Sequence, residues 1–189
     1  AVEKVLIKNN KAIGVMLKDG SEVFADKVIS NLNPKLLFKK LVDRDEVNQE
    51  YRRKILNYKC GSGTFRMNVA LSELPDFNCL RGKEVSEHHK SGIIIAPSLT
   101  YMDQAFTDAK QYGWSKNPIV EMLIPSTVDS SLAPEGKHVA SLFCQQFAPT
   151  LPDNRSWHDE KYSAADTIIE TVNRFAPNFK DSILGMSML

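Results

Sequence analysis

Residues 120–149 constrain the fold most strongly, because they form two apolar segments joined by a connection rich in Ser, Pro and Gly. This pattern predicts two neighbouring strands of one sheet. Side chains alternate between the two faces of a strand, so each predicted strand offers apolar groups to both sides. Such a pair is typical of the centre of a sheet that has helices on one face and a pocket on the other. The sequence leaves open which face is which.

The alternation assigns each side chain to a face. In the first strand one face holds Val120, Met122 and Ile124, and the other holds Glu121 and Leu123. In the second strand one face holds Val139, Ser141, Phe143 and Gln145, and the other holds Ala140, Leu142, Cys144 and Gln146.

The first thirty residues also alternate, on either side of the dipeptides Asn9-Asn10 and Asp19-Gly20. Both dipeptides favour tight turns between strands. The pattern predicts a three-stranded meander, followed by a short strand from Lys27 to Ser30.

Helical spacing appears at 34–42 and 46–58, with Pro34 suited to a first helical position. It returns at 100–113, where Thr100 is the expected cap, and at 160–177, where Pro177 would lie just past the helix end. Residues 63–71 alternate between polar and apolar side chains, and residues 91–97 contain a short apolar run. The predicted class is therefore α+β: an antiparallel or mixed sheet with packed helices, preceded by a three-stranded β-meander.

Composition excludes several classes of protein. The 24 basic and 23 acidic residues give a net charge of +1, and no basic stripe is interleaved with aromatic residues, so no nucleic-acid partner is expected. No apolar run approaches the roughly 18 residues of a membrane span. Three widely spaced cysteines predict neither a disulfide framework nor a zinc site, and a reducing compartment is expected.

Two local patterns contain residue types that occur in ligand sites. Residues 61–63 are Gly-Ser-Gly, but a phosphate-binding loop would need a further glycine where Arg66 stands, so a turn is predicted. His88 and His89 are adjacent, point in different directions and have no carboxylate or thiol at ligand spacing. No metal site is predicted.

Ser126, Asp129 and His138 contain the residue types of a nucleophilic triad. A serine nucleophile needs a strained elbow such as G-x-S-x-G, which the sequence lacks. Turn chemistry, in which the serines and Asp129 cap backbone groups, is the favoured interpretation.

Several segments together resemble a known family. Residues 1–34, "AVEKVLIKNNKAIGVMLKDGSEVFADKVISNLNP", resemble the pattern V-x-x-I, G-V-x-L-x-D-G, A-x-x-V-I-S-N-x-x-P of FAD-dependent carotenoid desaturases and flavin amine oxidase-like proteins. "LSELPDF", "IPSTVDSSLAPEGKHVASLFCQQFAP" and "FAPNFKDSILG" resemble, in that order, segments of phytoene dehydrogenase-related oxidoreductases. Within that family the segments are most similar to the pyridine nucleotide-disulphide oxidoreductase domain-containing protein 2 type.

The resemblance implies a position within a longer enzyme. The family's G-x-G-x-x-G motif and its closing glycine-rich segment, which hold FAD, do not occur between Ala1 and Leu189. We therefore expect a central fragment, with residues 1–33 belonging to the flavin-binding half and residues 34–189 forming a substrate-binding domain. FAD is the cofactor expected in the full-length parent, and the fragment alone is not expected to retain it.

The resemblance also implies three cofactor contacts. Val2 occupies the strand position whose backbone touches the adenine, and Ser30 with Asn31 forms the turn that approaches the flavin-binding core. No residue is assigned as catalytic, because hydride transfer to a flavin is the chemistry of the cofactor.

The expected function is to position an apolar small-molecule substrate for hydride transfer to flavin, with the fragment itself inactive. The alternative is a non-enzymatic binding or assembly module that retains a flavoprotein fold. Further expectations are that the fragment self-associates through apolar surface on the meander and beside "SILGMSML", and that the parent associates with a membrane surface. The expected location is the cytoplasm, or the mitochondrial matrix in a eukaryote.

Overall fold

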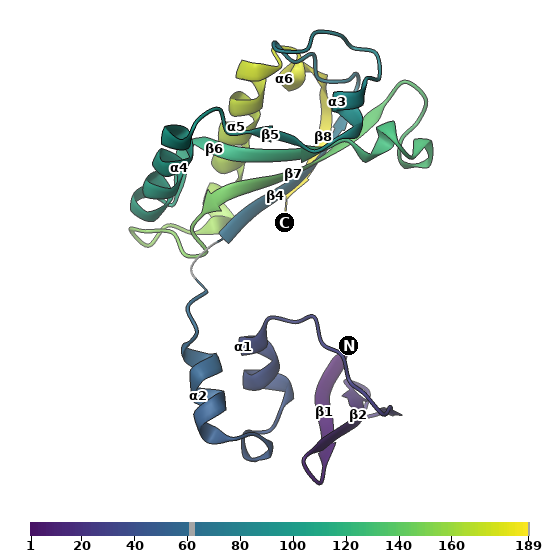
Figure 1. The fold of residues 1–189 in the computed structure, drawn as a ribbon, viewed down its shortest axis with the longest axis vertical. Coiled ribbons are helices and arrows are strands. Elements are labelled where there is room, and N and C mark those ends of the chain that lie inside the picture. The colour runs from purple at the N-terminus through teal and green to yellow at the C-terminus, as the bar shows by residue number, and fades with distance from the viewer. Residues whose placement is uncertain (61–62, 189) are drawn as a thin grey trace. The chain divides into compact units, whose positions relative to one another are not determined.

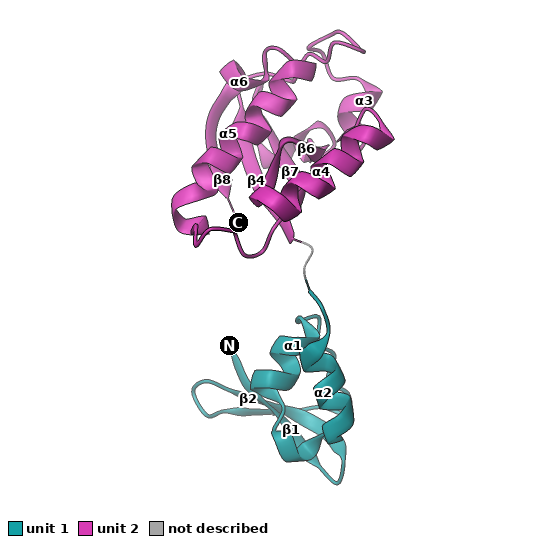
Figure 2. Ribbon diagram, turned by 90° about the vertical axis from the view of Figure 1, so that its left-hand side faces the viewer, with its two compact units in different colours: residues 1–60 teal, residues 61–189 magenta. Residues whose placement is uncertain are grey.

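The computed structural model describes residues 1–60 and 63–188, and its chain divides into two compact units, residues 1–60 and 61–189 (Figure 2). Gly61 and Ser62, where a Gly-Ser-Gly turn was predicted, lie outside the described residues, as does Leu189. Each unit is described by itself.

The predicted meander is confirmed in the first unit. Strands β1 (Val2–Lys8), β2 (Lys11–Leu17) and β3 (Glu22–Phe24) form an antiparallel sheet in the order β1-β2-β3. Asn9 and Asn10 have φ angles of 50° and 59°, as a tight turn of this kind requires. At the second turn Asp19 accepts hydrogen bonds from Ser21, and Gly20 has a φ of 84°.

The predicted strand from Lys27 to Ser30 is wrong. The last ladder-like contact of this segment is the bond from Ala25 N to Ile13 O, at 2.9 Å, and residues 27–30 have no regular structure. A strand needs a neighbouring strand to bond its backbone, and alternation in sequence alone does not supply one. Ile29 is accordingly 93% exposed.

The two helical segments of the first unit are confirmed, with different bounds. Pro34 opens helix α1 (Pro34–Leu36), and the Asn33 side chain accepts a bond from Lys35 N. A π-helical turn (Leu37–Leu41) continues it, and helix α2 spans Gln49–Asn57 with Asn48 as its cap.

The second unit contains a five-stranded sheet in the order β5-β6-β7-β4-β8 (Figure 1). All four neighbouring pairs are antiparallel, which settles the choice between an antiparallel and a mixed sheet. The predicted pair of apolar strands forms β6 and β7 at its centre, with Val120 opposite Cys144. The strands are β4 (Gly63–Leu71), β5 (Ile93–Ile95), β6 (Trp114–Leu123), β7 (His138–Phe147) and β8 (Ile183–Met188).

Two long helices pack on this sheet. Helix α4 (Leu99–Tyr112) begins one residue before the predicted cap Thr100, which is wrong: Ser98, with an extended backbone, accepts the bond from Tyr101 N at 3.1 Å. Helix α5 (Trp157–Phe175) is capped by Ser156 and ends before Pro177 as predicted.

Helix α5 covers one face of the sheet, which we call the core face (Figure 1). Val120, Met122 and Leu142 lie on this face and are at most 1% exposed, while Leu123 on the other side is 55% exposed. The predicted alternation is confirmed, and it now distinguishes the core face from the opposite, open face. Gln146 departs from it, because the β6–β7 register shifts between Trp114 and Ile119.

The elements that were not predicted include strand β8 and the short helices α3 (Glu87–Lys90) and α6 (Phe179–Ser182). Helices of four residues give too little periodicity to recognise from a sequence. Strand β8 falls in the apolar run "SILGMSML", for which no strand was predicted.

The predicted division at 33/34, between the flavin-binding half and the substrate-binding domain of a longer enzyme, stays a prediction. By their contacts, α1 and α2 belong with the meander in the first unit. Among the described residues, no helix is both long enough and apolar enough to cross a bilayer.

Candidate functional site

The three predicted cofactor contacts line one cavity in the first unit. Val2, at the start of β1, and Ser30 with Asn31, after β3, border a space of about 560 Å³. Residues that are 28 positions apart in sequence thus lie around one space. That they contact FAD remains a prediction.

The chemistry of this cavity is mainly aliphatic. The Ser30 hydroxyl accepts a bond from Leu32 N at 3.3 Å, and Lys40 supplies a cationic group that was not among the predicted contacts. The sequence could have indicated Lys40 through its spacing of one helical turn from Leu36, because this spacing places both side chains on the same side of a helix. The remaining lining residues are Ala1, Val5, Val15, Val28, Ile29, Leu32, Leu36, Leu37 and Leu41.

These residues fit part of a dinucleotide better than the whole of it. Aliphatic side chains can pack on a flat base, and Ser30, Asn31 and Lys40 offer polar groups. A pyrophosphate is held by glycine-rich turns at a helix N-terminus, and no glycine is among the described residues that line the cavity. The cavity therefore suits the apolar end of such a ligand.

The second surface of interest is the open face of the five-stranded sheet. One cross-strand row on it contains Arg66, Phe143, Glu121 and Ile94, from β4, β7, β6 and β5. Phe143 is 37% exposed and Ile94 is 65% exposed. The row therefore mixes apolar and charged side chains across four strands.

The charged groups of this face bind to their neighbours. Arg66 donates to the Ser141 hydroxyl at 3.2 Å, and Gln145 donates to the Glu121 carboxylate at 2.5 Å. Because these polar atoms have partners within the sheet, the face can meet an apolar ligand with fewer unsatisfied groups. Helix α4 packs against β6 and β7, and the Tyr101 hydroxyl donates to Pro118 O at 2.9 Å.

The adjacent histidines have separate roles. His89 is fully buried: its Nδ1 accepts from Ser86 N at 3.2 Å, so the ring Nε2 is the donor to Pro75 O at 3.0 Å. The prediction that the two rings point in different directions is wrong, because the His88 ring lies beside that of His89 with a centroid distance of 3.9 Å. Among the described residues no group of three His, Cys, Asp or Glu is arranged to hold a metal ion.

Of Ser126, Asp129 and His138, the structure brings two side chains together. Ser126 Oγ lies 3.4 Å from His138 Nδ1, but the same hydroxyl accepts a bond from Val139 N at 3.1 Å. Asp129 instead accepts two bonds from Ser131, as a turn residue does. These bonds favour the interpretation as turn chemistry.

The fold of this chain recurs in a solved structure. An oxidoreductase from Methanosarcina mazei superposes with a TM-score of 0.58 at 18% sequence identity, covering 100% of this chain and 36% of that one. No model of a known protein family matches the sequence.

Sequence similarity defines the class: the chain is a partial-length relative of FAD-dependent oxidoreductases and carotenoid isomerases. Over its whole length it is homologous to pyridine nucleotide-disulfide oxidoreductase domain-containing protein 2 of Mus musculus, with 34% identity over 194 residues. Prolycopene isomerase 2, chloroplastic, of an Oncidium hybrid cultivar is 29% identical over 189 residues, or 97% of this chain. These matches confirm the family resemblance.

The chain spans about one third of the length of the curated relatives it matches: 33% of the mouse protein and 28% of the Oncidium protein. The activity of the whole protein is therefore a proposal.

Proposed function

We propose that this chain is part of an FAD-dependent oxidoreductase that desaturates a C–C bond of an apolar substrate, in which one carbon gives up a hydride to FAD and the neighbouring carbon loses a proton to solvent. In this proposal the first unit contributes one wall of the cofactor site, and the open face of the five-stranded sheet contributes to the binding of the substrate. FAD, when bound, supplies the hydride acceptor.

The observation that carries the proposal is the cavity of the first unit. Family resemblance alone selected Val2, Ser30 and Asn31, and the fold independently groups them around one space of about 560 Å³. A grouping of this kind is expected if these residues share a ligand.

The substrate role rests on the open face. Phe143, Leu123 and Ile94 leave apolar surface exposed there, while Arg66 and Glu121 have partners within the sheet. A long conjugated or isoprenoid molecule is the substrate class that such a surface favours, in keeping with the names of the prolycopene isomerases among the relatives.

The test uses a longer protein that contains this chain. Purified under native conditions, it should show flavin absorption bands, and these should bleach without oxygen when a partly saturated carotenoid precursor is added. A protein that carries no flavin would favour the non-enzymatic binding module instead. Geometric conversion of a polyene without flavin bleaching would contradict hydride removal and favour isomerase activity.

A further inference from the structure

Glu121 is the only carboxylate in the five described strands of the second unit. It lies on the open face of the sheet, directly opposite Ile94 on β5 and Phe143 on β7. Side chains that face each other across an antiparallel pair have Cβ atoms about 5 Å apart. The carboxylate is therefore flanked on both sides by side chains that leave apolar surface exposed.

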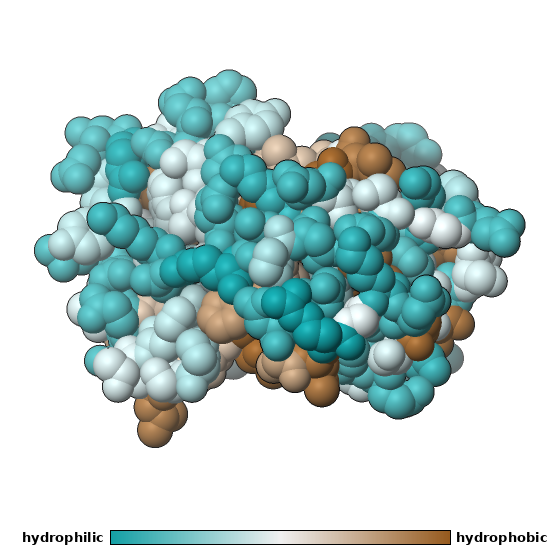
Figure 3. Space-filling model, turned by 90° about the horizontal axis from the view of Figure 1, so that it is seen from above, coloured by the Kyte–Doolittle hydropathy of each residue, from teal (hydrophilic) through white to brown (hydrophobic). Residues whose placement is uncertain are grey.

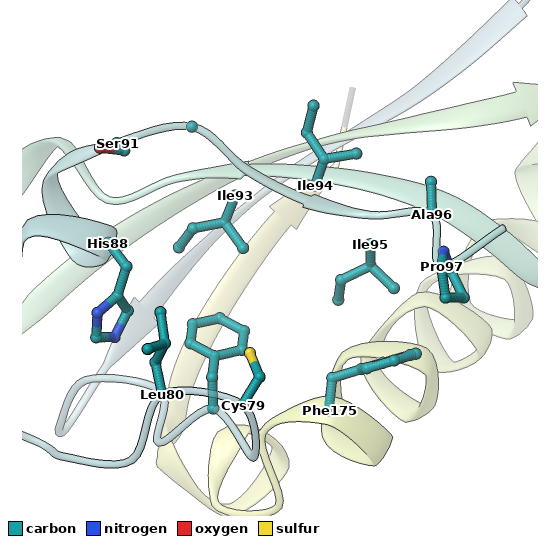
Figure 4. A pocket seen from close by; sticks show the side chains of 12 residues that line it. Cys79, Leu80, His88, Ser91, Ile93, Ile94, Ile95, Ala96, Pro97 and Phe175 are labelled. Atoms are coloured by element: carbon teal, nitrogen blue, oxygen red, sulfur yellow. The ribbon is translucent and has the colours of Figure 1, made fainter.

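Figure 4 shows the direction of one of these neighbours. The side chains of Ile93 and Ile95 point to the same side of β5, toward a cavity of about 450 Å³, whereas Ile94 points away. Ile95 belongs to the core of the unit and Ile93 packs against it. The apolar surface of Ile94, beside Glu121, is therefore accessible from the open face.

The carboxylate of Glu121 is held in place without an opposite charge. Gln145 Nε2 donates to its Oε1 at 2.5 Å, and among the described residues no other group bonds or pairs with this carboxylate. Arg66, the cationic group of the same row, lies one strand further on, beyond Phe143, and donates to the Ser141 hydroxyl. The amide thus orients the carboxylate and leaves its second oxygen, Oε2, able to accept a proton.

A half-buried carboxylate between apolar side chains costs free energy of folding, because it loses hydration and gains no counter-charge. Desaturation gives such a group two uses. Positive charge develops on the carbon that loses a hydride, and a nearby carboxylate stabilises it. The neighbouring carbon must then lose a proton, which a base within reach can accept.

We propose that Glu121 is this base, an inference that rests on the proposed function. One C–H bond of the substrate breaks, and its electron pair leaves with the hydrogen as a hydride for FAD. The C–H bond of the neighbouring carbon breaks, its electron pair forms the new C=C bond, and its proton binds to Glu121 Oε2. From there the proton passes to solvent. The substrate loses two electrons, which FAD gains.

The test uses a longer protein that contains this chain, with Glu121→Gln as the main variant. The new amide oxygen can still accept the bond from Gln145, so the fold and the flavin content should be retained, but the amide is not a base. Flavin bleaching by a partly saturated carotenoid precursor should slow by about a hundredfold or more, the usual contribution of a general base. Glu135→Gln, in the exposed connection between β6 and β7, is the matched control and should bleach at the unmodified rate.

Rescue by an added base separates proton transfer from a structural effect. In Glu121→Ala protein the lost side chain leaves room for a small carboxylate, so the bleaching rate should rise in proportion to added formate. Formate should leave the rate of Glu135→Gln unchanged. A slow rate in Glu121→Ala that formate does not raise would overturn the assignment.

An equilibrium measurement tests the position of the carboxylate without turnover. Geranylammonium and geraniol share an isoprenoid body, but only the first carries a positive charge. In equilibrium dialysis at low salt the unmodified protein should bind geranylammonium about fivefold more tightly than geraniol, and Glu121→Gln should bind the two equally. Equal binding by the unmodified protein would show that a ligand on the open face does not lie against Glu121, which contradicts the inference.

The outcomes distinguish this inference from the proposed function. A flavin-containing protein that the precursor does not bleach in its unmodified form contradicts the proposed function. Bleaching that is equally fast in the unmodified protein and in Glu121→Gln supports the proposed function and contradicts the assignment of Glu121 alone.

Discussion

Leu142 and Phe143 are neighbours in β7 that meet opposite environments. Leu142 is fully buried against the helix-covered core, and Phe143 is 37% exposed on the open face. The sequence placed them on opposite faces but left open which face helices cover, because alternation carries no information about what packs on either side. Helix α5 packs on the face that holds Leu142, so this is the covered face.

Truncation of these two residues should therefore have different consequences. Leu142→Ala removes buried methyl groups and should lower the free energy of unfolding by about 2–5 kcal/mol. Phe143→Ala should cost only about 1 kcal/mol, because much of its surface is already in water. In a longer, active protein Phe143→Ala should instead raise KM for an apolar substrate. Large, equal losses of stability in urea denaturation would mean that the face is buried, which contradicts a substrate surface.

Hydrogen bonds, rather than regular secondary structure, hold the loop after β4 in place. Asn178 accepts from Asp76 N at 2.8 Å and donates to Leu74 O at 2.9 Å and to the Glu73 carboxylate at 2.8 Å. The bond from Asn178 and, next, the contact with Lys83 lower the pKa of Glu73. One side chain therefore joins the loop to the region after α5.

We expect Asn178→Ala to lower the free energy of unfolding by about 1–3 kcal/mol at pH 7, because it leaves its partners unsatisfied. The pH dependence should change as well. A carboxyl whose folded pKa is lowered stabilises the fold above its unfolded pKa of about 4.3, and this contribution is lost as the pH falls through the folded value. Without Asn178 the loss of stability below that pH should be less steep. Asn68→Ala, exposed on β4, is the control; an identical acid dependence in both variants would refute the linkage.

The strands show which parts of the fold a sequence pattern can predict and which parts it cannot. The meander was predictable because the Asn9-Asn10 turn and the alternation around it specify the same structure. The segment 27–30 contains the β-branched pair Val28 and Ile29 but pairs with no described strand, and no local pattern records whether a partner strand exists. Strand β8 pairs with β4 across more than a hundred residues, and such a pairing is set by tertiary structure. A cavity of about 450 Å³ in the second unit could not be predicted for the same reason, because Phe77, Ile93 and Phe175, which line it, are far apart in sequence.

At the scale of the whole molecule, each unit has its own buried residues. The main core lies entirely within the second unit, whereas Val5, 8% exposed, is buried in the first. Figure 3 shows one face of the molecule, on which hydrophilic groups predominate and hydrophobic ones form separate patches. Self-association through apolar surface on the meander and beside "SILGMSML" remains a proposal.

The two cores predict separate responses to mutation. Both tryptophans, Trp114 and Trp157, lie in the second unit with ring centroids 5.5 Å apart, so tryptophan fluorescence reports on that unit. Leu142→Ala should shift the fluorescence transition in urea to lower concentration. Val5→Ala should leave it in place while changing the circular dichroism transition. A fluorescence midpoint that moves equally in both variants would show that the units unfold together.

The most direct test of the cofactor assignment is the ratio of flavin to protein in a longer protein that contains this chain. Ser30→Trp would fill the cavity that Val2, Ser30 and Asn31 line, whereas Ser21→Trp places the same residue on the exposed second turn of the meander. The predicted result is a flavin ratio at least about tenfold lower for Ser30→Trp, as expected if bulk in the cavity costs 1.4 kcal/mol or more of binding, and an unchanged ratio for Ser21→Trp. Equal flavin content in the two folded variants would contradict a cofactor role for this cavity.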